Sequence, residues 1–336
     1  MKWKDIQVNI LVKAYLRKVF HAGFYVKVTV FYLVILSGNS LWAQDQSSYS
    51  EYLYNHLYNQ NPAAAGFDGS IISQLSVSKK WMGTRDSPSA QVLSTSVRLG
   101  EEEFYDEKML IRKSFVNLAP RVGLGLTVMN REAGPLRQTG LLLAYAYHIS
   151  IRESRLSLGI SGTISRYHLN TSKFNPVNPD DNVLYADNNA IIPDFNAGIL
   201  YYNRSFFGGI SVNRLVNFSR KLNHRQDDPD IIICGGYKFK TGSSFKLEPS
   251  VFIQKIQDQD VIFDINGKLY YNDRNWLILS YRNNGELTGV IGLTVKPGFL
   301  INYGYTLGLS GFSNYNSGSH SISLKVNVET LIRNRK

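Results

Sequence analysis

Between residues 121 and 167 the chain alternates apolar and small residues with a period of two, in three successive runs. The apolar members are Val122, Leu124, Leu126 and Val128, then Leu141, Leu143, Tyr145, Tyr147 and Ile149, then Leu156, Leu158, Ile160 and Ile164. The positions between them carry mostly Gly, Ser, Ala and Thr. A period of two places each set on one face of a β-strand. A solvent-washed face normally carries Lys, Glu and Arg, so the pattern favours a barrel with a small-residue lumen and a lipid-facing apolar surface.

The alternation continues beyond this stretch and predicts fourteen strands in all. Two of them conflict with a simple strand. Pro249 interrupts one and requires an edge, a bulge or a misassigned strand, and NWLILSYR in another alternates poorly. The predicted ranges are 71–81, 89–99, 120–130, 139–151, 154–168, 193–203, 205–214, 230–241, 244–256, 260–271, 275–283, 286–296, 298–309 and 319–329.

The lengths of the connections support a transmembrane barrel, in which short periplasmic turns alternate with longer outer loops. The connections after the fourth, sixth, eighth, tenth and twelfth strands are short. Those after the third, fifth, seventh and thirteenth are longer, and 169–192 is the longest. Two outer loops, near 257–259 and 283–285, would be short, and residues 100–119 are a clear exception, because they are long where a turn is expected. The sequence therefore predicts an all-β, antiparallel transmembrane β-barrel of about 14 strands.

The N-terminus has the pattern of a Sec-type signal peptide, which predicts export to the outer membrane. A basic region precedes the apolar Val28–Leu36, and Leu41-Trp42-Ala43 forms a plausible cleavage site. We therefore expect a signal peptide at 1–43, a short periplasmic or plug segment at 44–69, the barrel at 70–329 and a basic C-terminal tail at 330–336.

The net charge gives little support for a nucleic-acid partner. The full chain carries 37 Lys and Arg against 26 Asp and Glu, and residues 1–43 supply six of these cations and one of the acids. Removing them lowers the formal charge from +11 to +6, so the export signal accounts for almost half of the excess. The one cysteine, Cys234, excludes an intramolecular disulfide and falls on the small-residue parity, which predicts a buried, inert thiol.

No set of residues forms a convincing catalytic or metal site. His148 could neighbour Ser161 or Ser165 across two strands, but a hydrogen bond in the lumen explains that arrangement better than a hydrolase. Asp180, Asp181, Asp187 and Asp194 cluster in one loop without EF-hand spacing, which indicates a solvated loop rather than a calcium site. We therefore expect no catalytic residue, no cofactor and no metal.

Aromatic residues at strand ends are typical of anchors at the lipid interface, which explains most of them. The tyrosine-rich stretch 49–58 precedes the first strand and needs a different explanation. A plug in the lumen and a periplasmic docking element both fit it.

Several short motifs follow one another in order along the chain. A tyrosine-rich opening runs into Asn-Pro-Ala and a glycine, a strand pair with Trp-Gly, Pro and Gln follows, and a Gly-Pro turn joins the next pair. The stretch PDFNAGILYYNRSFFGGISVNRLVN and a terminal Ser-His complete the set. The residues concerned are Asn61, Pro62, Ala63, Gly66, Trp81, Gly83, Pro88, Gln91, Asn130, Gly134, Pro135, Gly140, Tyr145, Tyr147, Ser319 and His320. Together these motifs resemble those of the PorP/SprF family of outer-membrane proteins of Bacteroidetes.

The resemblance implies a non-enzymatic component of the type IX secretion system. It implies partners in the periplasmic ring of that machinery and a cargo protein with a C-terminal sorting domain, in some members a gliding adhesin. The Gly, Ser and Thr parity of the lumen supports an alternative, a passive or substrate-specific outer-membrane channel.

Overall fold

The computed structural model describes residues 56–84, 86–99, 121–170, 189–215, 229–241, 244–256, 260–309 and 316–333. Two 3-10 turns, η1 (Leu57–Asn59) and η2 (Pro62–Ala64), precede the strands, and a short helix, α3 (Val328–Arg333), follows them. The strands are β1 Ile72–Lys79, β2 Ser89–Leu99, β3 Val122–Ala133, β4 Leu136–Ile151, β5 Ser154–Leu169, β6 Asn189–Tyr202, β7 Phe206–Asn213, β8 Asp230–Tyr237, β9 Phe239–Lys240, β10 Phe245–Ile256, β11 Ile262–Tyr271, β12 Asn275–Arg282, β13 Glu286–Lys296, β14 Phe299–Gly308 and β15 Ser319–Asn327.

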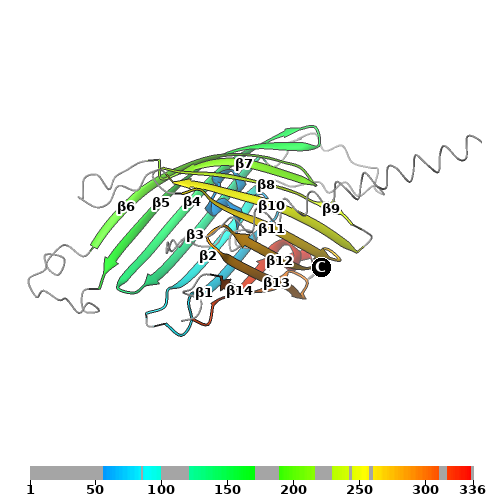
Figure 1. The fold of residues 1–336 in the computed structure, drawn as a ribbon. Coiled ribbons are helices and arrows are strands. Elements are labelled where there is room, and N and C mark those ends of the chain that lie inside the picture. Colours follow the sequence, from blue (N-terminus) through cyan, green and yellow to red (C-terminus); the bar gives the residue numbers. More distant parts are fainter. Residues whose placement is uncertain are drawn as a thin grey trace, which may run out of the picture. The chain divides into compact units, whose positions relative to one another are not determined.

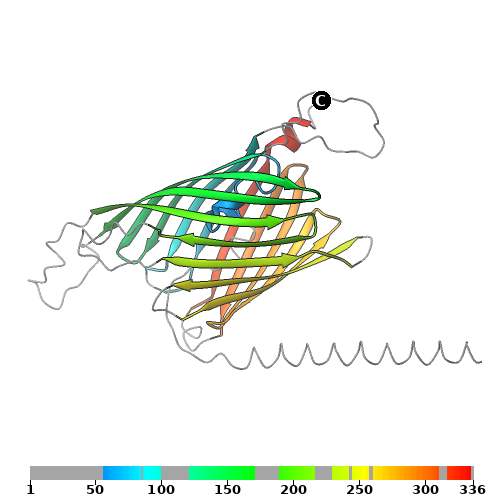
Figure 2. The ribbon, with the colours of Figure 1, turned by 90° about the horizontal axis from the view of Figure 1, so that it is seen from above.

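The strands form one closed antiparallel sheet in which each strand pairs with its neighbours in the chain, except that β8 and β9 both pair with β10 and not with each other (Figures 1 and 2). β15 pairs with β1 and closes the ring, with Ile72 opposite Asn327 and Lys79 opposite His320. The predicted fold is confirmed as a closed 14-stranded antiparallel β-barrel, because β8 and β9 together make one barrel strand.

The interruption between β8 and β9 lies beside the proline that conflicted with a strand. Gly236 of β8 opposes Ser250 and Lys240 of β9 opposes Lys246, so both pieces keep one register on β10. Pro249 lies within β10 between these pairs and has no N–H to give to the ladder. The sheet accommodates the proline by a local break in the neighbouring strand rather than by an edge.

The two faces of the barrel differ as the alternation predicts. Large apolar side chains cover the outside, where Leu143 is 57%, Ile160 63% and Leu279 58% exposed. Small and polar side chains such as Ser94, Ser157 and Ser211 point inward and are buried. β12 follows the same rule, although its sequence alternates poorly because Trp276 and Ile278 face inward.

The connections gather at two ends of the barrel. The described turns 152–153, 203–205, 272–274 and 297–298 lie at one end, here called the short-turn end, and the turn at 134–135 lies at the opposite end, here called the long-loop end. The predicted longer connection after the third strand is wrong, because β3 and β4 extend to a two-residue turn at Gly134 and Pro135. No helix in the described part of the chain is long and apolar enough to cross a membrane.

Candidate functional site

Residues 56–69, here called the inner segment, lie inside the ring of strands and lead into β1 at the short-turn end (Figures 1 and 2). Asn61 caps η2, since its side chain accepts a hydrogen bond of 3.0 Å from Ala63 N, and Pro62 occupies the first position of that turn. An Asn cap followed by Pro is a common start for a helical turn, because Pro has no N–H to leave unpaired. The Asn-Pro-Ala motif therefore fixes the local shape of the inner segment.

The same Asn61 side chain also holds the inner segment to β6 and β7. Its Nδ2 donates to the carbonyl of Ile199 at 3.1 Å. The neighbouring Gln60 carbonyl accepts from Ser211 Oγ at 2.8 Å and from Asn213 Nδ2 at 3.1 Å. Two side chains of β7 thus satisfy the Gln60 carbonyl, and the Asn61 side chain donates to a backbone carbonyl of β6.

Glycines on the inner wall give the inner segment the space to approach. A Cβ on Gly123 would overlap the carbonyl of Ala65. A Cβ on Gly159 would overlap the backbone of Pro62 and Ala63, and one on Gly198 would overlap the Asn61 side chain. The small residues that suggested a lumen are therefore explained in part by direct backbone contact with the inner segment.

Tyr58 is the buried aromatic anchor of the inner segment, with 1% of its surface exposed. Its hydroxyl lies 2.8 Å from the Leu126 carbonyl, 3.1 Å from the Thr95 carbonyl and 2.8 Å from Thr127 Oγ1. The ring lies against the bare backbone of Gly125. A plug was one of the two explanations for the aromatic stretch 49–58, and its one described tyrosine lies inside the barrel.

His148 links the inner segment to the wall through a chain of hydrogen bonds. Its Nε2 lies 2.8 Å from the Ala65 carbonyl, which only accepts, so this nitrogen carries the proton. Nδ1 then accepts from the Tyr202 hydroxyl at 3.0 Å, and Arg98 donates both to that hydroxyl and to the Phe67 carbonyl. His148, Tyr202 and Arg98 are therefore each hydrogen-bonded to another part of the protein.

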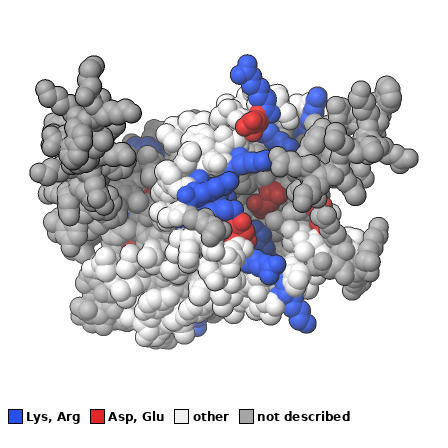
Figure 3. Space-filling view, turned by 90° about the vertical axis from the view of Figure 1, so that its right-hand side faces the viewer, with Lys and Arg blue, Asp and Glu red and all other residues white. Residues whose placement is uncertain are grey.

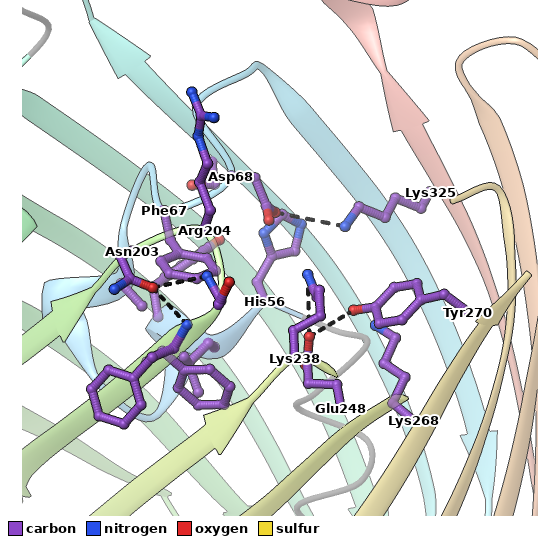
Figure 4. A pocket seen from close by; sticks show the side chains of 17 residues that line it. His56, Phe67, Asp68, Asn203, Arg204, Lys238, Glu248, Lys268, Tyr270 and Lys325 are labelled. Atoms are coloured by element: carbon purple, nitrogen blue, oxygen red, sulfur yellow. Dashed lines mark hydrogen bonds and ion pairs between the residues drawn. The ribbon is translucent and has the colours of Figure 1, made fainter. Parts of the chain in front are cut away.

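A cavity of about 190 Å³ lies beside the inner segment at the short-turn end (Figure 4). Lys238 Nζ and the Tyr270 hydroxyl both lie 3.2 Å from Glu248 Oε2. Lys325 Nζ lies 3.6 Å from Asp68 Oδ2. Sequence reasoning did not select these residues, although charged side chains on the small-residue parity, such as Lys325, were a usable signal.

His56 lines the same cavity and packs edge-on against Tyr58, with ring centroids 5.2 Å apart. Burial, and to a smaller extent the Lys325 ammonium, lowers the pKa of His56 to about 3, against a weaker upward effect of Asp68. The imidazole is therefore neutral at neutral pH.

The remaining motif residues do not join the inner segment. Trp81 N donates to Ser319 Oγ at 3.2 Å, and His320 Nδ1 lies 2.8 Å from the Tyr303 hydroxyl. These contacts, with Gly83, Pro88, Gln91, Gly134 and Pro135, lie toward the long-loop end. Tyr145 and Tyr147 are exposed on the outer face of β4, as lipid-interface anchors would be. The structure therefore divides the family motif between the lumen, the rim and the outer surface.

The serine–histidine pair considered from the sequence, His148 with Ser161 or Ser165, does not form. Ser161 Oγ accepts from Asn196 Nδ2 at 2.9 Å and Ser165 Oγ accepts from Gln138 Nε2 at 3.3 Å, while His148 binds Ala65 and Tyr202. Cys234 is buried on the inner face, as predicted. Within the described ranges, no group of three or more His, Cys, Asp or Glu side chains could hold a metal ion.

Several predicted features lie outside the described residues. These are the signal peptide at 1–43, residues 44–55, the exceptional connection at 100–119, the tail residues 334–336, and Asp180, Asp181 and Asp187 of the acidic loop. Asp194, the fourth acid of that cluster, is described, and its Oδ1 accepts from Phe195 N at 2.7 Å.

A closed antiparallel barrel with an apolar exterior and a polar interior defines an outer-membrane β-barrel protein. The family model described as "Type IX secretion system membrane protein PorP/SprF" matches residues 41–326. The chain belongs to this family, and is therefore an outer-membrane component associated with the type IX secretion machinery.

Solved outer-membrane barrels resemble the chain at low sequence identity. The CymD monoaromatic hydrocarbon channel is 10% identical, with 88% of this chain and 96% of that chain covered and a TM-score of 0.49. Omp33 of Acinetobacter baumannii is 7% identical, with 76% and 96% covered and a TM-score of 0.44. The toluene transporter TodX of P. putida is 8% identical, with 80% and 92% covered and a TM-score of 0.43. A comparison with curated proteins found no match.

Proposed function

We propose that this protein supports the export or surface attachment of cargo carrying a C-terminal sorting domain, as a non-enzymatic component of the secretion machinery. The observation that carries the proposal is the family match over residues 41–326, which spans the inner segment and almost the whole barrel. A Sec-type signal peptide at 1–43 delivers the chain to the periplasm. Its partners are the cargo, in some members a gliding adhesin, and the periplasmic ring components.

The motif residues lie toward opposite ends of the barrel, which supports two separate regions of contact with partners. Short turns and chain termini of such barrels face the periplasm, and longer loops face outward. The inner segment leads into β1 at the short-turn end, which faces the periplasm, where ring components lie. Trp81, Ser319 and His320 lie toward the outer side, where attached cargo is displayed.

An affinity pull-down from crosslinked outer membranes tests this proposal. The tagged protein should recover, by mass spectrometry, a protein with a C-terminal sorting domain or the periplasmic ring components. A tagged outer-membrane barrel of an unrelated family is the control. Recovery of neither partner above that control would contradict the proposal.

A passive or substrate-specific channel is the second candidate, and the cavity beside the inner segment favours it. Because the inner segment is hydrogen-bonded to each strand from β2 to β7, we expect the purified protein to show no conductance in planar bilayers. Stable single-channel conductance of the unmodified protein would favour the channel over the scaffold.

A further inference from the structure

The cavity at the short-turn end has walls of opposite character. Leu57, Phe67 and Phe207 form an apolar side, with the Phe67 and Phe207 ring centroids 6.5 Å apart. Lys238, Lys268 and Lys325 belong to the other side, as Figure 4 shows for the labelled Phe67, Lys268 and Lys325. Pockets of this kind bind ligands through an apolar surface and a few convergent polar groups.

The lining carries more positive than negative charge. Four cations, Lys238, Lys268, Lys325 and Arg204, face two carboxylates, Asp68 and Glu248, which leaves a formal excess of two. Figure 3 shows Lys and Arg gathered around the middle of the corresponding end of the protein. Confined cationic surfaces of this sort concentrate anions.

Among the three lysines of the lining, Lys268 is the one without a carboxylate partner in the described part of the chain. Lys238 pairs with Glu248 and Lys325 with Asp68, whereas Lys268 makes no ion pair with any residue that the structure describes. Its ammonium instead lies 4.8 Å from the Tyr270 ring centroid and 4.6 Å from that of Trp276. The two rings hold the ammonium in place by cation–π attraction and leave its hydrogen-bond donors available to a ligand.

We propose that this cavity binds a carboxylate carried on an apolar group, with the carboxylate against Lys268 and Lys325 and the apolar part against Phe67 and Phe207. The site is reached from the short-turn end, which faces the periplasm in barrels of this class. Such a group is the terminal residue of a polypeptide or a small free acid. The inference does not rest on the proposed secretion role, and it stands or fails independently of the pull-down.

Isothermal titration calorimetry on the purified full-length protein in detergent tests the proposal with four probes. Phenylacetate and N-acetyl-Ala-Phe with a free carboxylate represent the two sources, and 2-phenylethanol and the C-terminal amide of the same dipeptide are their neutral counterparts. We expect at least one acid to bind at least tenfold more tightly than its neutral counterpart, and more weakly as salt is raised. Binding of the dipeptide acid alone indicates a polypeptide terminus, and binding of phenylacetate alone indicates a small acid.

Charge-removing variants connect that binding to the cavity. Lys268→Gln and Lys325→Gln should each weaken binding by roughly tenfold or more, as expected for the loss of one charged hydrogen bond. Lys296→Gln removes an exposed cation at the same end that does not line the cavity, and should leave binding unchanged. Heat-modifiable mobility on electrophoresis shows whether each variant is folded. Absence of acid binding, equal binding of the neutral probes, or full binding by both folded cavity variants would overturn the proposal.

Discussion

Gly159→Ala should release the inner segment from the barrel wall without unfolding the barrel. The added Cβ would overlap three backbone atoms of Pro62 and Ala63, which no side-chain rotation can relieve. The inner segment must therefore move away from β5. The hydrogen bond of 2.7 Å from Ser157 Oγ to the Ala63 carbonyl and that of 2.8 Å from His148 to Ala65 would lengthen or break.

The expected loss of local stability follows from these contacts. Overpacking in a filled interior costs about 1–3 kcal/mol. Each weakened hydrogen bond adds about 1 kcal/mol or less. We therefore expect the free energy that holds the inner segment to fall by about 2–4 kcal/mol, which raises the released population roughly 30- to 1,000-fold.

Amide hydrogen exchange of a peptide covering residues 57–69 measures that population directly. The amide of Gly66 reports it best, because it donates to Ser96 Oγ on the barrel wall. Gly162→Ala is the matched control on the same strand, since its Cβ would meet only Phe195 at an ordinary 3.8 Å. Unchanged exchange in Gly159→Ala, or an equal increase in the control, would refute the reasoning. Heat-modifiable mobility should stay intact in both variants.

Three other perturbations test different parts of the structure. His56 has a folded pKa near 3 because it is buried, so below pH 6.5 the released segment binds a proton that the packed one does not. Exchange corrected for its intrinsic rate should therefore rise as soon as the pH falls below 6.5, and His56→Gln should remove that first rise, whereas the rise at lower pH from Asp68, whose folded pKa is also lowered, should remain. Arg282 and Asp264 form a buried pair at 2.8 Å, so Arg282→Met should lower unfolding stability in urea by about 3–5 kcal/mol, and a second Asp264→Leu change should recover most of it. Leu143→Arg, in the middle of the outer face of β4, should destabilise the barrel in phospholipid vesicles by about 2–4 kcal/mol. Ile151→Arg, at the end of the same strand, should cost about 1 kcal/mol or less. Equal costs for the two variants would contradict a lipid-facing belt.

The barrel could be predicted from the sequence because strand alternation is a local signal. Each run of apolar residues fixes which face meets lipid, and short connections force consecutive strands to pair. The fourteen predicted strands follow the observed ones closely. Pro249 indicated an irregularity in its own strand, whereas the structure keeps β10 continuous and interrupts the neighbouring strand between β8 and β9. The tight turn at Gly134 and Pro135 was missed, because polar side chains on β3 and β4 concealed the continuation of both strands.

Only the tertiary structure assigned roles to the inward-facing residues. Gly123, Gly159 and Gly198 belong to three strands and contact one inner segment, and no sequence period links glycines so far apart to Asn61. The charged cavity arises in the same way, since Lys238, Lys268 and Lys325 meet only when the sheet closes. The sequence by itself determined the alternation, the number of strands and the family. Closure of the ring decided which residues face one another across the lumen, because those contacts depend on register around the whole barrel and not on any neighbouring stretch of chain.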